Sequence, residues 1–120
     1  MLSDEGLNYL FPFVITVDGT SYEQMVPGRV ARVFAEESRE AEQSYSWEES
    51  NHIFKTAFFL FANQVDAATT FAQNCGGGGS APDKDWGRDE NEDDILWARR
   101  CFRKAREMVT TPVIRWGRRR

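Results

Sequence analysis

Apolar residues recur at steps of three and four through residues 46–74, which is the spacing of one helical face. Ser46, with Glu49 three residues later, forms a capping box at the start of this stretch. The glycines after Asn74 end it. The pattern predicts one long helix over 47–74 with apolar positions at Ile53, Phe54, Ala57, Phe58, Phe61, Val65, Ala68 and Phe71 or Ala72.

Two further helices are predicted, at 28–45 and 88–109. In the first, Val30, Val33 and Phe34 form an apolar stripe after Pro27, and the acids at 36–42 indicate a solvated face. In the second, acids crowd the start and bases crowd the end, an order that complements the helix dipole.

The N-terminal part has a different pattern. Residues 8–26 are rich in β-branched and aromatic side chains, and Asp18-Gly19 lies between FVITV and TSYEQMV. This arrangement predicts a β-hairpin with Pro12 at a strand start or edge. The fold class is therefore a small, mainly α-helical domain of about three helices with an N-terminal β-hairpin. Its expected core is Phe11, Phe13, Val33, Phe34, Phe54, Phe58, Phe61, Val65, Ile95, Trp97, Phe102 and Met108.

We expect one domain over 1–112, a flexible glycine-rich joint at 75–87 and a basic tail at 113–120. The joint contains GGGGS, which is also the commonest synthetic linker unit. A single glycine would be enough to end the preceding helix, so four in a row favour a joint that moves.

The net charge of −4 hides an asymmetry between the two parts of the chain. Residues 1–98 hold 18 acidic and 6 basic side chains, a balance of −12, whereas residues 99–120 hold nine bases and one acid, a balance of +8. The basic end is therefore the informative part of the composition.

Five short segments within 61–108 carry a resemblance to a known family. They are Val65–Thr69, Cys75–Gly79, Trp86-Gly87, Asp89–Asp94 and Trp97–Cys101. In their order they resemble the C-terminal parts of small mobilization or conjugation accessory proteins of Bacteroidota-type mobile genetic elements. The resemblance covers about two fifths of the chain. It implies that the glycine run is native, and it transfers no catalytic role.

The basic end is the candidate nucleic-acid-binding site, because arginines bind phosphates through charge and paired hydrogen bonds. Trp116 is a candidate for stacking on an exposed base. The expected function is a non-enzymatic accessory protein that contacts DNA or a nucleoprotein complex through the C-terminal helix and tail. The residues are Arg99, Arg100, Arg103, Lys104, Arg106, Arg115, Trp116, Arg118, Arg119 and Arg120.

The alternative function is a protein–protein adaptor or structural subunit that acts through an aromatic helical surface. The phenylalanines exceed what a small monomer is expected to cover, so the sequence predicts a homodimer or larger oligomer with its interface at Phe58, Phe59, Phe61 and Phe71; the alternative is that the N-terminal hairpin and the helix at 28–45 cover them.

No catalytic constellation is visible, so we expect no enzyme, no cofactor and no small-molecule substrate. Glu48, Glu49 and His52 share a helix face, but a surface histidine is the simpler interpretation and no metal site is expected. Cys75 is expected to be exposed and Cys101 to be a buried free thiol. With no signal-peptide pattern and no apolar run long enough to span a bilayer, the expected location is the cytoplasm.

Overall fold

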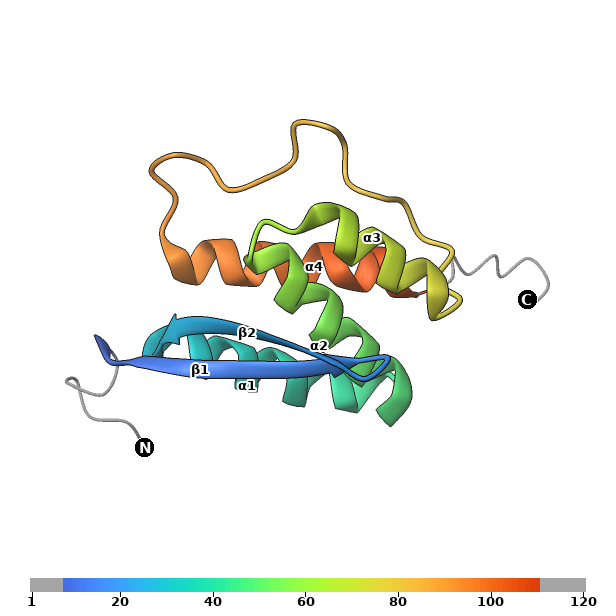
Figure 1. Ribbon diagram of the computed structural model, residues 1–120, viewed down its shortest axis with the longest axis horizontal. Coiled ribbons are helices and arrows are strands. Elements are labelled where there is room, and N and C mark those ends of the chain that lie inside the picture. The colour runs from blue at the N-terminus through green and yellow to red at the C-terminus, as the bar shows by residue number, and fades with distance from the viewer. Residues whose placement is uncertain (1–7, 111–120) are drawn as a thin grey trace.

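The structure is a computed structural model, which describes residues 8–110. It is mainly α-helical, with an N-terminal hairpin of β1 (Leu10–Val17) and β2 (Thr20–Pro27). Four helices follow: α1 (Gly28–Ser44), α2 (Trp47–Phe61), α3 (Val65–Asn74) and α4 (Asp94–Val109). The hairpin lies along one side of the helices, and the segment between α3 and α4 arches along the opposite side (Figure 1). The predicted fold class is confirmed.

The hairpin forms as the sequence predicts. Its strands are antiparallel and are joined by a two-residue turn in which Asp18 and Gly19 have φ of 50° and 82°. Two successive positive φ values define a turn whose twist matches that of the strands, and Asp-Gly tolerates them well. Side chains alternate between the two faces, so Ile15 and Val26 are buried against the helices.

The prediction of one helix over 47–74 is wrong, because the chain breaks between α2 and α3. Asn63 has a φ of 63°, and the Asn63 and Gln64 amides donate to the carbonyls of Leu60 and Phe59. This is the hydrogen-bond pattern of a glycine-type helix end, with asparagine in the left-handed position. The break lets α3 turn back and pack on α2. The apolar residues that recur through 46–74 therefore form the buried faces of two helices rather than one.

The last helix begins at Asp94 rather than at residue 88. Asp93 is its N-cap, and the Asp93 carboxylate accepts a 2.7 Å hydrogen bond from the Ile95 amide. The acids at 89–92 therefore precede the helix. The Asp94 carboxylate forms a bidentate ion pair with Arg29 of α1, whose guanidinium donates two hydrogen bonds of 2.7 and 3.1 Å. This pair fixes the N-terminal end of α4 on α1.

Phe34 lies at the centre of the core. Its ring makes edge contacts with four other phenylalanines, from β1, α2 and α4: Phe13, Phe54, Phe61 and Phe102. Of the twelve expected core residues, six are fully buried, namely Val33, Phe34, Phe58, Trp97, Phe102 and Met108. Five more are partly buried against them, and Phe11 is not part of this cluster.

Two glycines of the run, Gly77 and Gly79, pack closely against the end of α4, while the flexibility expected of the joint at 75–87 stays a prediction. Gly76, with φ of 84°, ends α3, and Gly77 donates to the Ala72 carbonyl. The run then crosses the end of α4. A Cβ at Gly79 would overlap the Glu107 backbone, and one at Gly77 would overlap the Met108 carbonyl oxygen. Glycine is required here because two backbones approach each other.

Within residues 8–110, none of the helices combines the length and the apolar character that crossing a membrane requires.

Candidate functional site

Most bases of α4 are used inside the molecule. Arg99 binds Glu36 and Glu37 of α1, at 3.2 and 2.8 Å. Arg106 binds the other carboxylate oxygen of Glu37, and a carboxylate oxygen of Glu40 lies 3.6 Å from the Arg106 guanidinium. The two hydrogen bonds from Arg99 to Glu36 and Glu37 raise the pKa of the Arg99 guanidinium. Among the acids at 36–42, which were expected to be a solvated face, Glu37 is buried and joins α1 to α4, whereas Glu36, Glu40 and Glu42 are exposed.

Arg100 is held in a second internal cluster. It donates to the Glu92 carboxylate at 2.7 Å and to the Gly87 carbonyl at 3.0 Å. Its guanidinium also lies 5.4 and 5.3 Å from the ring centroids of Trp86 and Trp97. These contacts anchor the segment before α4. The Arg100 guanidinium therefore already has partners inside the molecule.

The two remaining bases of α4 differ in exposure. Arg103 is exposed, whereas the Lys104 side chain is 18% exposed and pairs with Glu107 at 3.0 Å. Both line a shallow depression of about 170 Å³ beside Trp86. The other predicted nucleic-acid-binding residues, Arg115, Trp116, Arg118, Arg119 and Arg120, lie outside the described residues. Of the five predicted α4 residues, Arg103 is the only one without an ion-pair partner within residues 8–110.

The predicted aromatic interface is wrong for Phe58 and Phe59, which are 3% and 2% exposed in the single chain. They are covered because α3 turns back over α2 and the hairpin packs on the same helix. Phe61 and Phe71 are partly buried and pack against the core. A dimer stays a prediction, but these four side chains do not offer a surface for it.

Of the six exposed large apolar side chains within residues 8–110, four lie on or next to the hairpin, and the other two are Trp47 of α2 and Leu96 of α4. Leu10, Val14 and Met25 are 60%, 55% and 45% exposed, and all three are on its outer face. Tyr9 precedes β1 and is also exposed. The sequence analysis did not predict this exposed apolar face. The signal for it was that β1 has apolar residues at both odd and even positions, which face opposite sides of the hairpin.

The outer edge of β2 has no strand beside it. The Gly28 amide donates a hydrogen bond to the Tyr9 carbonyl. In an antiparallel hairpin every second pair of opposite residues is hydrogen-bonded, so every second pair from Tyr9–Gly28 to Val17–Thr20 joins β1 to β2. The backbone groups of Ser21, Glu23 and Met25 therefore point sideways. Among the residues that the structure describes, their only partner is the Gln24 side chain, 3.5 Å from the Met25 carbonyl.

The outer edge of β1 is blocked in two ways. Pro12 is at an outward-pointing position, and it has no N–H to offer. The Thr16 carbonyl, which also points outward, accepts a 2.9 Å hydrogen bond from Lys55 of α2. Proline and lysine are common protections of edge strands. The hairpin therefore has one protected edge and one open edge.

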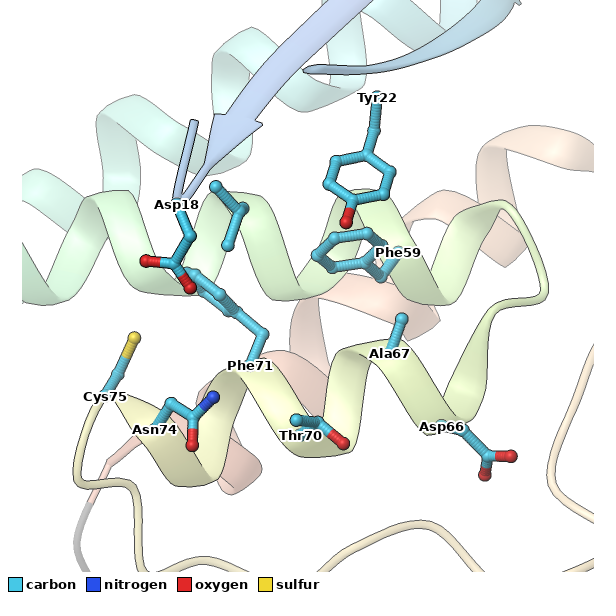
Figure 2. Close-up of a pocket in the computed structure, with 10 residues that line it drawn as sticks. Asp18, Tyr22, Phe59, Asp66, Ala67, Thr70, Phe71, Asn74 and Cys75 are labelled. Carbon is cyan, nitrogen blue, oxygen red and sulfur yellow. The ribbon is translucent and has the colours of Figure 1, made fainter. Parts of the chain in front are cut away.

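A pocket of about 460 Å³ lies between the hairpin turn, α2 and α3. Figure 2 shows Phe59 of α2 at its base, with Tyr22 of β2 above and Phe71 of α3 at the side. The Phe59 ring centroid lies 5.1 Å from that of Tyr22 and 6.1 Å from that of Phe71. Asp18 and Asp66 also line the pocket.

The cysteines and the histidine do not form a site. Cys101 is fully buried, as expected, and burial raises the pKa of its thiol. Cys75 is half-buried rather than exposed, and burial raises its pKa, with Lys55 acting in the opposite sense. His52 packs edge-on against Phe71. No cluster of three metal-ligating side chains occurs in the described part of the chain.

Comparisons with protein-family models, curated proteins and solved structures find no match to this chain. Function is therefore inferred from the geometry of this chain alone.

Proposed function

We propose that this chain is a non-enzymatic protein-interaction module that captures an extended segment of a partner protein by β-strand addition to β2. The observation that carries the proposal is the open edge at Ser21, Glu23 and Met25, opposite a protected edge on β1. An added strand takes its affinity from main-chain hydrogen bonds and its specificity from alternate side chains. The outer face of the hairpin gives such a strand apolar neighbours.

The partner strand is a segment of another protein with basic character. Glu23 is exposed at the centre of the open edge, and a base beside it in the new strand forms a favourable cross-strand pair. A second copy of this chain fits less well. Two-fold antiparallel pairing of β2 centred on Glu23 places the Glu23 side chains of the two copies opposite each other, and like charges repel.

This proposal modifies the adaptor alternative, since it places the interaction on the hairpin in place of the helices. We also propose a cytoplasmic location for the protein. The free thiols of Cys75 and Cys101 support it, because free thiols persist in reducing compartments.

The test is selection of binding peptides from a display library of random extended sequences, followed by edge variants. Glu23→Pro removes one outward N–H from β2 without removing a bond between β1 and β2. We expect binding of the selected peptides to fall at least about tenfold, because two or three main-chain hydrogen bonds lose their register. Titration calorimetry measures the decrease.

Val14→Pro is the matched control, because Val14 is directly opposite Glu23 and faces the protected edge. It should retain binding. Circular dichroism and thermal unfolding establish that both variants fold. Equal binding by the two variants contradicts the proposal, and so does a library that yields no peptide. A chain that dimerises through β2, seen as a mass doubling that Glu23→Pro abolishes, would replace the partner segment with a second copy.

A second candidate is contact with nucleic acid by an accessory protein of a mobile genetic element. The depression lined by Trp86, Arg100, Arg103, Lys104 and Glu107 favours it, because the exposed Arg103 can meet a phosphate beside an aromatic ring. The internal pairing of Arg99 and Arg106 reduces the charge available for such contact. A contact of this kind therefore depends more on the basic tail than on the helix.

For this candidate, the double variant Arg103→Ala/Lys104→Ala should weaken binding of a labelled single-stranded oligonucleotide. The slope of log affinity against log salt should fall by about one for each phosphate that the variant no longer neutralises. Fluorescence anisotropy at several salt concentrations measures both. Arg32→Ala/Arg39→Ala removes the same charge from α1 and should have a smaller effect. Equal effects of the two pairs would mean that net charge alone attracts the oligonucleotide.

A further inference from the structure

The pocket beside β2 combines aromatic rings with carboxylates that have no ion-pair partner among the described residues. Tyr22, Phe59 and Phe71 supply three ring faces or edges within about 460 Å³. Neither Asp18 nor Asp66 takes part in an ion pair with any residue of 8–110. In Figure 2 the Asp18 carboxylate extends from the turn toward Phe71, whereas Asp66 lies at the other end of the pocket with its carboxylate directed away from the rings.

This combination fits an organic cation. The face of an aromatic ring attracts an ammonium or guanidinium group, and nearby carboxylates add a charge of the right sign. Lys55, whose ammonium donates to the Thr16 carbonyl, does not line the pocket and so does not fill that role. The alkyl part of a lysine or arginine side chain suits the apolar base formed by Phe59.

The location of Tyr22 connects the pocket with the open edge of β2. Residues directly opposite each other in neighbouring strands have their side chains on the same face of a sheet. The Tyr22 side chain is on the inner face and reaches Phe59. The residue of an added strand that lies opposite Tyr22 therefore directs its side chain toward the same pocket, whereas its neighbours face outward.

We infer that the pocket holds the lysine or arginine side chain that lies opposite Tyr22 in the captured strand. This inference rests on the proposed strand addition for the identity of the ligand, but the affinity of the pocket for a cation can be measured without any strand. The pocket would then be the specificity element of the interaction, while the edge of β2 supplies main-chain hydrogen bonds to a strand of any sequence.

The first test titrates the full chain with butylammonium and, as the neutral isostere, butan-1-ol. NMR follows the ring protons of Tyr22, Phe59 and Phe71. We expect saturable shifts with butylammonium and a dissociation constant about 2–5-fold lower than that for butanol. Asp18→Asn/Asp66→Asn should remove the difference. Asp85→Asn/Glu90→Gln removes the same charge from exposed loop positions and should leave it unchanged.

The second test uses the peptides selected on the β2 edge. We expect lysine or arginine at the position opposite Tyr22, and replacement of that residue by norleucine should weaken binding to the wild-type chain more than to Asp18→Asn/Asp66→Asn. Peptides that bind the edge without a basic preference would overturn the inference and leave strand addition standing. Saturable butylammonium binding by a chain that captures no peptide would reject strand addition and retain a cation site. Equal affinity for butylammonium and butanol overturns the cation site itself.

Discussion

Replacing Phe34 with alanine is expected to lower the free energy of unfolding by about 3–5 kcal/mol, the usual cost of removing a large buried aromatic side chain. Phe34 is fully buried and contacts rings from three other elements. Its removal leaves a cavity where β1, α2 and α4 meet. A domain of this size has about 5–15 kcal/mol of stability in total, so the variant should be close to unfolding. Urea denaturation followed by circular dichroism measures the change.

Phe11→Ala is the control for this prediction. Phe11 belongs to the same hairpin face as Phe13 but lies outside the buried cluster, so its removal should cost about 1 kcal/mol. Similar decreases for the two variants would show that the core is not centred on Phe34.

Gly79→Ala is expected to lower the free energy of unfolding by about 1–3 kcal/mol, because a Cβ at that position overlaps the Glu107 backbone and one segment must move. A backbone group cannot rotate away as the end of a flexible side chain can. The end of α4 also contributes the buried residues Met108 and Val109, so its displacement disturbs the core. Thermal and urea unfolding measure the effect.

Gly87→Ala is the matched control, because Gly87 has open space around its Cα and a φ that other residues adopt. It should be neutral, or slightly stabilising through a stiffer unfolded chain. If the two alanine variants have the same stability, then the glycine run is a mobile joint, as the sequence alone predicted.

The fold class could be predicted from the sequence because periodicity and turn chemistry are local signals. Asp18-Gly19 specified the hairpin, and Ser46 specified the start of α2, where its hydroxyl accepts from the Glu49 amide as the capping box requires. The break at Asn63 could not be predicted, since apolar spacing continues through it and asparagine only permits the left-handed conformation. The packing of Gly79 on α4 is a contact between distant segments, which no local pattern reveals.

The candidate site could be predicted even less. Charge runs showed where bases occur, but not that Arg99 and Arg106 pair with Glu37, because ion pairs between helices depend on tertiary arrangement. The open edge of β2 follows from the register of the hairpin together with the blocking of β1 by Pro12 and Lys55. Pro12 was visible as an edge residue, whereas the role of Lys55 depends on the position of α2.

The place of α4 in the chain order has a consequence for how the protein is made. This helix covers buried faces of both α1 and α2, yet it is synthesised after them, with α3 and a long connecting segment in between. At roughly 5–20 residues per second, the newborn chain spends several seconds with these aromatic faces uncovered. The fold therefore closes only after α4 has been made, and until then the nascent chain presents the kind of apolar surface that chaperones bind.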